Sequence, residues 1–311
     1  MSNVSPKPEL VAKLEAIKPR LELRAGLISA LRQFYDDRGF LDTETPVLIP
    51  APAPEEYIEA PAADGGFLRS SPELQMKCML AAGYDRMFQI GPCFRKNEYG
   101  RRHRPEFTML EWYQAGVDYL ALAEFTCAML CFAARRVLGK TTVCRGERTI
   151  DFALPWEYLT VHEAYRRYAG VEAEQALADD TFDELMVTKI EPELGWGQPT
   201  FLLDYPACRS SLARLKPSNP AVAERWELYL GGIEIANAFS ELIDPAEQKA
   251  RFQQAREKRR LEGYQDYPEA TDFLAMLDYG LPKSAGCALG VDRLAMVFAG
   301  ADDIADVTYP R

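Results

Sequence analysis

The sequence has few of the residues that usually hold a structural metal ion. Its 311 residues include two histidines, His103 and His162, and seven cysteines that form no Cys-x-x-Cys pair. Structural zinc sites need four cysteine or histidine ligands at characteristic spacings, so we expect no zinc site. The odd number and scattered positions of the cysteines are typical of a reduced protein and predict a cytoplasmic location.

Long apolar segments are also missing. The first twenty residues contain no apolar signal core, and no run approaches the roughly 20 apolar residues that span a membrane. We find no internal repeat and no low-complexity segment. Apolar residues nevertheless make up 48% of the chain, which is enough for a substantial core. The length fits one large domain or two small ones, with no membrane partner.

Positive charge is in the minority. The chain has 36 lysines and arginines against 47 aspartates and glutamates, for a net charge of −11. Such an acidic protein is a poor candidate for a broad nucleic-acid surface, although a local basic patch can still serve one.

The positive charge that is present gathers between two predicted strands, within residues 88–113. Residues 88–94 have the aromatic and β-branched content of a strand, which we expect Gly91-Pro92 to interrupt. The next ten residues carry one acid, Glu98, and six basic side chains: Arg95, Lys96, Arg101, Arg102, His103 and Arg104. The paired N–H donors of arginine guanidinium groups match phosphate oxygens in geometry and charge, so this hairpin suits a polyphosphate. A solvated surface loop with scattered arginines is the alternative.

The second predicted strand alternates in character. Phe107, Met109, Glu111 and Tyr113 are expected on one face, and Thr108, Leu110 and Trp112 on the other.

Three stretches together resemble a known family. The string FR…E…RH.PEFTMLEWY in the basic hairpin closely resembles motif 2 of the class II aminoacyl-tRNA synthetases, in its lysyl form. Residues 40–46, FLDTETP, are similar to motif 1, the strand and proline of the dimer interface. Residues 286–294, GCALGVDRL, are similar to motif 3, a strand entering a helix with an ATP-binding arginine. The motifs occur in the family's order, from about Leu21 to the C-terminus, which makes the resemblance highly specific.

The resemblance implies an α+β fold: a class II synthetase-like catalytic domain, with an antiparallel sheet of about six strands flanked by helices. It also implies a homodimer across the Pro46 region. We expect residues 1–18 to form an N-terminal tail and residues 19–311 to form the catalytic domain. An anticodon-binding OB-fold needs five strands. Only about twenty residues precede the first predicted catalytic helix, so we expect no such domain.

The same resemblance implies an ATP site. Arg95 is expected to grip the α-phosphate, and Arg293 of motif 3 to lie on the γ-phosphate side, both as catalytic residues. Many lysyl-type enzymes read Arg-Asn-Glu from the first arginine onward, whereas here the acid comes one position later, at Glu98. Further ATP contacts are expected from Lys96, Asn97, Arg104, Glu234, Ile235 and Gly290.

Ser71, Pro72 and Glu73 predict the start of a helix, because serine is a good N-cap and proline suits the first helical position. The resemblance implies that these residues also line the amino-acid pocket, with Glu73 facing the substrate ammonium. Glu111 and Tyr113 resemble the lysine-pocket pair of lysyl enzymes, so a carboxylate-rich pocket for a diamino acid is expected. A core tyrosine with a satisfied hydroxyl is the alternative for Tyr113.

Glu234 and Glu241 stand in an otherwise apolar run around Gly231-Gly232. Acids in such positions cost free energy unless they are paired or bound to a cation. The resemblance implies that both acids hold Mg²⁺ against the ATP phosphates and that Glu241 also contacts the substrate. Structural ion pairs with arginines are the alternative.

Ala288 departs from the lysyl form of motif 3, which has glycine there. One methyl group in a pocket is worth about 1–3 kcal/mol, enough to reverse a choice between near-isosteres. This change and the missing OB-fold match the lysyl-synthetase paralogues that modify elongation factor P. That family activates (R)-β-lysine with ATP and transfers it to a lysine side chain of the factor, so elongation factor P is the expected partner and tRNA is not.

Two alternatives stay open. One is a minimal lysyl-tRNA synthetase that charges tRNA or another RNA. The other is a catalytically inactive regulatory paralogue that only binds a ligand.

Overall fold

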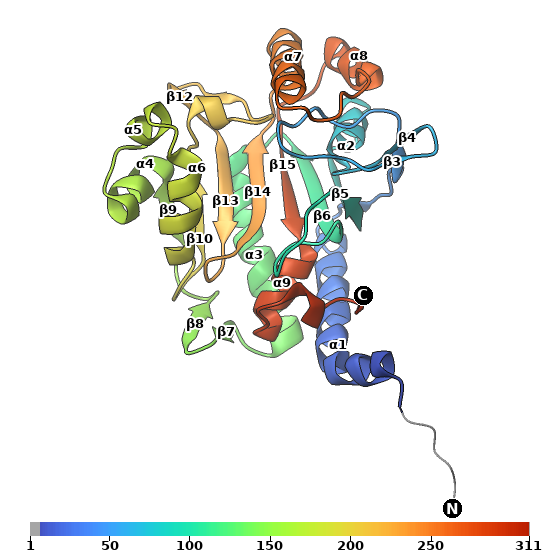
Figure 1. Cartoon of the computed structure of the whole chain (residues 1–311), viewed down its shortest axis with the longest axis vertical. Coiled ribbons are helices and arrows are strands. Elements are labelled where there is room, and N and C mark those ends of the chain that lie inside the picture. Colours follow the sequence, from blue (N-terminus) through green and yellow to red (C-terminus); the bar gives the residue numbers. More distant parts are fainter. Residues whose placement is uncertain (1–6, 311) are drawn as a thin grey trace, which may run out of the picture.

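The structure, a computed structural model, describes residues 7–310 and is built around one large sheet (Figure 1). Eight strands lie in the order β1-β5-β6-β15-β14-β13-β10-β9. Their bounds are Leu41–Asp42 (β1), Arg86–Phe94 (β5), Glu106–Ala115 (β6), Ser284–Gly290 (β15), Glu234–Ser240 (β14), Arg225–Tyr229 (β13), Thr200–Leu203 (β10) and Glu157–Thr160 (β9). The six strands from β5 to β10 pair antiparallel, and β1 and β9 add parallel edges. The predicted α+β architecture with a six-stranded antiparallel core is confirmed.

Three helices cover one face of the sheet: α1 (Glu9–Asp36), α3 (Tyr119–Leu138) and α9 (Val291–Ala299). Their apolar residues bury the side of β6 that carries Leu110 and Trp112. The α3 helix begins where the Asp118 carboxylate accepts two backbone N–H groups. Helix α1 begins ten residues before the predicted domain start. Residues 9–18 are therefore helical, residues 1–6 lie outside the described residues, and the division into tail and catalytic domain stays a prediction.

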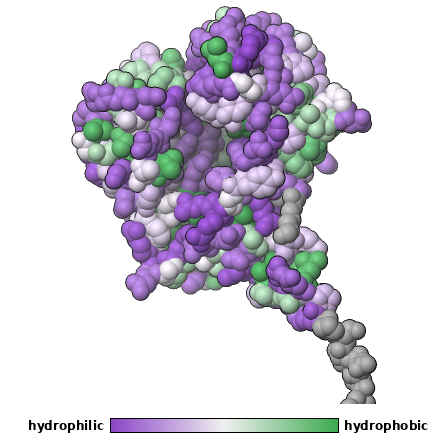
Figure 2. All heavy atoms as spheres, in the orientation of Figure 1, coloured by the Kyte–Doolittle hydropathy of each residue, from purple (hydrophilic) through white to green (hydrophobic). Residues whose placement is uncertain are grey.

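The opposite face is covered only at its two sides. Helices α2 (Glu73–Ala81), α7 (Pro245–Leu261) and α8 (Thr271–Tyr279) pack over one side around Tyr113 and Phe239. Helices α4 (Val161–Ala164), α5 (Ala173–Ala178) and α6 (Phe182–Leu185) lie beside β9 and β10 (Figure 1). Between these groups the molecule is hollowed over β13 and β14, and hydrophilic residues line the hollow (Figure 2).

The remaining strands form small separate sheets. They are β2 (Leu48–Ile49), β3 (Ala62–Ala63) and β4 (Gly66–Leu68), the hairpin of β7 (Thr142–Arg145) and β8 (Arg148–Asp151), and the pair of β11 (Leu215–Lys216) and β12 (Asn219–Ala223). Across residues 7–310, we see no helix with both the length and the apolar character that a membrane crossing requires.

Strand β5 runs unbroken through Gly91-Pro92, so the expected interruption is wrong. Pro92 lacks an N–H group, but its backbone faces the outer edge of the sheet beyond β1. At that edge, the Nε atom of Arg69 donates to the Pro92 carbonyl at 3.0 Å. The N–H of Phe94 in turn donates to the Arg69 carbonyl at 2.8 Å. The arginine therefore takes the place of a neighbouring strand.

Residues 40–49, which include the segment similar to motif 1, do not form one continuous strand. Two-residue strands, β1 and β2, flank a segment that contains Pro46. Gly231 and Gly232 form the turn between β13 and β14. Both glycines have positive φ, 59° and 71°, which joins β13 to β14 and places Glu234 at the start of β14.

Candidate active site

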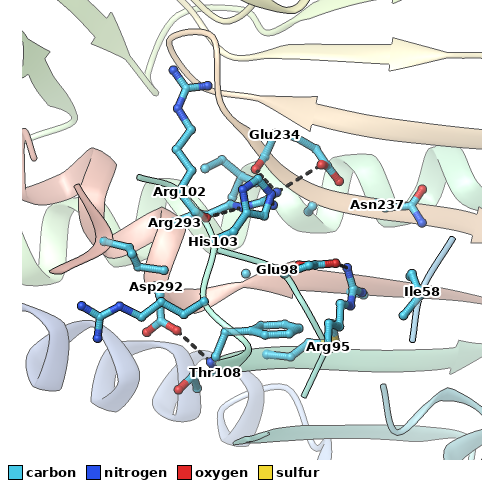
Figure 3. Close-up of a pocket in the computed structure, with 18 of the residues that line it drawn as sticks. Ile58, Arg95, Glu98, Arg102, His103, Thr108, Glu234, Asn237, Asp292 and Arg293 are labelled. Atoms are coloured by element: carbon cyan, nitrogen blue, oxygen red, sulfur yellow. Dashed lines mark hydrogen bonds and ion pairs between the residues drawn. The ribbon is translucent and has the colours of Figure 1, made fainter. Parts of the chain in front are cut away.

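A cavity of about 250 Å³ lies over β6, β14 and β15 in the hollow (Figure 3). It brings together most of the side chains predicted to bind a nucleotide: Arg95, Arg104, Glu234, Ile235, Gly290 and Arg293. Ala288 also lines it, together with residues that were not predicted in the site: Glu55, Ile58, Glu98, Arg102, His103, Asn237 and Asp292. Four strands or loops that are distant in the sequence thus meet in one place.

Arg95 enters the cavity from the loop between β5 and β6. Its guanidinium lies 5.2 Å from the ring centre of Phe107, and its Nη1 atom lies 3.8 Å from Oε1 of Glu98. Its buried Nε atom has no hydrogen-bond partner among the described residues. A buried donor without an acceptor is costly, so this position suits an anionic ligand such as a phosphate.

Lys96 and Asn97 do not line the cavity. The Lys96 N–H already donates to the Glu59 carbonyl at 2.7 Å, and Asn97 has a φ of 65°, which asparagine tolerates. Both side chains are exposed, whereas the next residue, Glu98, lines the cavity. The turn thus directs both side chains away from the cavity, and the expected nucleotide contacts of Lys96 and Asn97 stay a prediction.

Arg293 lies in the first turn of α9 and is held by two other cavity residues (Figure 3). Its Nη1 atom donates to the carbonyl and to Oε2 of Glu234, both at 3.1 Å. Its Nη2 atom lies 2.6 Å from Nε2 of His103. Partial burial and then the positive charge of Arg293 lower the pKa of His103. A neutral ring can accept the arginine N–H. The sequence drew attention to His103 only as one member of a basic loop.

Arg104 reaches the cavity wall, but its Nη1 atom donates to the Tyr309 carbonyl at 2.9 Å. Arg102 is likewise tied to backbone, donating to the Gly232 carbonyl at 2.8 Å. Both arginines add positive charge to the cavity while they hold the hairpin turn and the C-terminal segment in place.

Asp292, the residue before Arg293, holds the start of α9 in place through two hydrogen bonds. One of its oxygens, Oδ2, accepts the Thr108 N–H at 2.8 Å, and the other, Oδ1, accepts from Nε of Arg24 at 2.9 Å. The buried carboxylate thereby connects α9 with β6 and α1. Motif 3 contains this aspartate, but its packing role is visible only in the structure.

The wall formed by residues 55–58 is held from behind by a buried arginine. Nη1 of Arg259, on α7, donates to the carbonyls of Glu55 at 2.6 Å and Ile58 at 2.7 Å. Burial raises the pKa of Glu55 to about 7, although Arg95 opposes the shift. Sequence patterns gave no indication of this wall, because proline-rich loops have no periodicity to read.

Beside the cavity lies a second, buried group of residues, named here the acid cluster: Glu73, Lys77, Glu111, Tyr113 and Glu241. The strand register connects the two sites. On the neighbouring strands β6, β15 and β14, one row of directly paired residues consists of Glu111, Ala288 and Asn237. The next row on the same face consists of Tyr113, Gly286 and Phe239. Opposed residues share a face of the sheet. Ala288 therefore stands between the cavity and the acid cluster.

Glu111 accepts two hydrogen bonds, from the Tyr113 hydroxyl at 2.6 Å and the Ser71 hydroxyl at 2.8 Å. Ser71 also accepts the Glu73 N–H at 3.0 Å, so its predicted cap and pocket positions coexist. Pro72, expected at the first helical position, instead occupies the N-cap position, because α2 begins at Glu73. Burial and then the charge of Glu73 raise the pKa of Glu111 to about 7.

Lys77 was missed. Its Nζ atom lies 2.6 Å from Oε1 of Glu73 and 2.5 Å from Oε2 of Glu241, and its side chain is 1% exposed. Burial raises the pKa of Glu241 to about 8, with Lys77 acting in the opposite direction. The sequence does show that Glu73 and Lys77 are four residues apart on one predicted helix, a spacing that allows an ion pair. The same spacing is typical of exposed pairs, so it did not indicate a buried one.

Glu234 and Glu241 lie in different sites, and metal binding by both acids stays a prediction. Seven residues of extended chain separate them by roughly 20 Å. Glu234 lines the cavity, whereas Glu241 is ion-paired with Lys77 in the acid cluster. No group of three or more histidine, cysteine, aspartate or glutamate side chains in the described part of the chain could hold a metal ion.

Glu234 alone still fits Mg²⁺. Its side chain is 38% exposed in the cavity, and Mg²⁺ commonly uses one or two carboxylates together with waters and substrate phosphates. The neighbouring Glu227 on β13 is occupied. Its Oε1 atom accepts from Arg225 at 2.6 Å, and its Oε2 atom accepts from Tyr205 at 2.6 Å and Tyr229 at 2.7 Å.

Comparison with known proteins gives a consistent result. Residues 9–311 match the family described as tRNA synthetases class II (D, K and N). The lysine–tRNA ligase of Dehalococcoides mccartyi is 39% identical over 313 aligned positions, which cover 91% of this chain and 62% of the relative. That of Moorella thermoacetica is 37% identical, covering 91% and 63%, and that of Magnetococcus marinus is 36% identical, covering 96% and 64%. The chain thus spans less than two thirds of these relatives' length.

Proposed function

The chain belongs to the class II tRNA synthetases of the D, K and N group, and from that premise we propose that it activates (R)-β-lysine or lysine with ATP. The activated acid is then transferred to a lysine side chain of elongation factor P. One observation carries this proposal. The cavity with Arg95 and Arg293 adjoins the carboxylates of Glu73, Glu111 and Glu241 along one sheet face.

The cavity suits the triphosphate. Arg95 offers a buried, unpaired Nε donor, and Arg293 is held in place by Glu234 and His103. Guanidinium groups bind phosphate oxygens well because their donors match the anion in charge and geometry. Glu234 would hold Mg²⁺, which when bound offsets charge on the phosphates.

The acid cluster suits the ammonium groups of the amino acid. With these held by carboxylates, the substrate carboxylate points along the sheet past Ala288 toward Arg95. The carboxylate oxygen attacks the α-phosphorus, and pyrophosphate leaves. Arg95 stabilises the charge that develops, and most of the acceleration comes from positioning.

In the second step, the neutral amine of the acceptor lysine attacks the carbonyl carbon of the adenylate. The C–N bond forms, the bond to AMP breaks, and the amine loses a proton to solvent. The product is an amide, and no covalent enzyme intermediate is required.

Two features support a protein acceptor. Ala288 occupies a position where the lysyl form of motif 3 has glycine, and it stands between the cavity and the acid cluster. The net charge of −11 also disfavours a broad phosphate-binding surface. We further propose a homodimer across the Pro46 region, where Leu41 and Leu48 are 47% and 44% exposed.

Charging of a tRNA with lysine is the second candidate, and the similarity of the chain to lysine–tRNA ligases supports it. One experiment separates the candidates. The protein is mixed with ATP, with either lysine or (R)-β-lysine, and with either elongation factor P or tRNA. ATP–pyrophosphate exchange and the mass of the acceptor are then followed.

We expect exchange that depends on the amino acid and a mass gain on elongation factor P. A gain on tRNA alone would replace this proposal by the second candidate. Absence of exchange with both amino acids would indicate an inactive paralogue. Arg95→Ala should abolish exchange and so excludes a contaminating synthetase.

A further inference from the structure

An ammonium group is buried in the acid cluster between two carboxylates. Lys77 projects from α2, its side chain is 1% exposed, and its Nζ atom contacts both Glu73 and Glu241. The ring centre of Phe239 lies 5.3 Å from the same atom. Burial by itself would lower the pKa of Lys77, but Glu241 and Glu73 outweigh it and hold the pKa above its usual value. Lys77 is therefore a permanent positive charge of the pocket.

The charges of the acid cluster do not balance. Glu73, Glu111 and Glu241 contribute three carboxylates, and Lys77 contributes one ammonium. When all are ionised, two negative charges remain without a counter-ion. Uncompensated buried charge is costly, so this arrangement favours a ligand that brings two positive charges.

One carboxylate oxygen of the acid cluster is buried without a hydrogen-bond partner in residues 7–310. Lys77 contacts Oε2 of Glu241, whereas Oε1 has no hydrogen-bond partner among the described residues. That oxygen points toward Gly286, where an added Cβ atom would lie 2.7 Å from it. The same Cβ atom would overlap the Tyr113 ring, so the absence of a side chain at Gly286 lets Tyr113 and Glu241 pack beside each other.

We propose that Lys77 is a specificity-determining positioning residue. By pairing with Glu73 and Glu241, Lys77 orients both acids. It neutralises one of the three carboxylates and leaves a net charge of −2 in the acid cluster, which selects substrates that carry two ammonium groups. The inference rests on the proposed activation of a diamino acid. It assigns the charge requirement to Lys77, a residue that need not touch the reacting atoms.

Lys77 also sets the pH at which Glu241 can bind an ammonium. The groups that face Glu241 are Lys77 and Glu73 from α2 and Glu111 and Tyr113 from β6. Burial raises the pKa of Glu241, the two acids raise it further, and Lys77 lowers it. Without the ammonium, Glu241 would stay protonated to a higher pH, and a protonated acid binds an ammonium weakly.

The test uses Lys77→Met and Lys77→Gln in ATP–pyrophosphate exchange with lysine, or with (R)-β-lysine if that is the substrate. kcat/KM for the amino acid is measured from about pH 6 to about pH 10. We expect the acidic limb of the profile to move up by about one pH unit, which is about a tenfold loss at neutral pH that recovers at alkaline pH. The KM for ATP should change less than about twofold.

Lys216→Met is the matched control. Lys216 forms an ion pair with Asp204 at 2.6 Å, outside the cavity and the acid cluster. Its profile should match that of the wild type. A loss that is equal at every pH, or an unmoved profile, in the Lys77 variants would overturn the proposal.

If the Lys77 variants fail to fold, calorimetry on the wild type decides. Norleucine has the length of lysine without the second ammonium, so it should bind on the order of 10³-fold more weakly. Equal affinities would overturn the charge requirement. Wild-type exchange together with unmoved variant profiles would contradict this inference alone, whereas absent wild-type exchange would contradict the proposed function itself.

Discussion

The Nε2 atom of His103 lies 2.6 Å from Nη2 of Arg293 and connects the loop after β5 with the start of α9. An arginine is always a donor, so the ring nitrogen must accept and the imidazole must be neutral. Partial burial and the charge of Arg293 keep the pKa of His103 below its usual value, which preserves this arrangement at neutral pH.

His103→Ala should raise the KM for ATP about tenfold and change the KM for the amino acid little. The variant loses a hydrogen bond to a charged group, worth about 1.5–3 kcal/mol, and frees Arg293 to leave the phosphate position. Initial rates of ATP–pyrophosphate exchange measure both constants. His162→Ala is the control, since His162 pairs with Glu174 outside the cavity. Equal KM values for ATP in the two variants would contradict the assigned role.

The same contact predicts a pH dependence. Because the folded-state pKa of His103 is lowered, the unfolded chain binds more protons as the pH falls through about 6.5. The contribution of His103 to stability is therefore present above that pH and is lost as the pH falls through the folded-state pKa. ATP affinity should weaken over the same acidic range in the wild type. It should stay flat in His103→Ala, as isothermal titration at several pH values would measure.

Asp292→Ala should lower the free energy of unfolding by about 3 kcal/mol. The change removes a buried carboxylate and leaves the Thr108 N–H and the Arg24 guanidinium without their acceptor. Urea denaturation measures the loss. Asp278→Ala removes an exposed partner of Lys249 and should cost less than about 1 kcal/mol. A similar small loss for Asp292→Ala would show that the buried network contributes little.

Parts of the site could be predicted because they follow local rules. Glu111 and Tyr113 are two residues apart on a strand, so they share a face, and the structure confirms this placement. The Ser71 hydroxyl accepts an N–H of the following helix, as an N-cap serine does. These predictions needed only the periodicity and capping chemistry of one segment.

Other parts depend on contacts between distant segments. Glu73 and Lys77 have the spacing of a surface pair, and nothing local indicates that Glu241, far along the chain, makes it a buried triad. The polar start of α1, followed by Pro19, looks like a tail because most of its residues face outward. Glu234 and Glu241 look alike in an apolar run, yet the length of the strand assigns them to different sites.

Gly286→Ala should reduce kcat/KM for the amino acid by about a hundredfold and lower stability by about 1–3 kcal/mol. The added Cβ atom would overlap the buried Tyr113 ring and lie 2.7 Å from Oε1 of Glu241. Exchange kinetics and thermal unfolding report the two effects. Gly26→Ala is the control, because nothing lies near its Cβ position in α1. It should stabilise the helix by about 0.5–1 kcal/mol. Unchanged amino-acid kinetics in Gly286→Ala would mean that binding of the amino acid does not depend on the positions of Tyr113 and Glu241.

Ala288→Gly should move the preference between the two lysine isomers toward α-lysine. The Ala288 methyl group stands between Glu111 and Asn237, on the path from the acid cluster to the cavity, so it limits where the substrate backbone can lie. One methyl group changes such a preference by about 10–200-fold. The ratio of kcat/KM for the two isomers in ATP–pyrophosphate exchange measures it. Ala285→Gly makes the same change on the other face of β15, where Ala285 is buried in the core, and should leave the ratio unchanged. A ratio that moves equally in both variants would assign the effect to strand flexibility rather than to the methyl group.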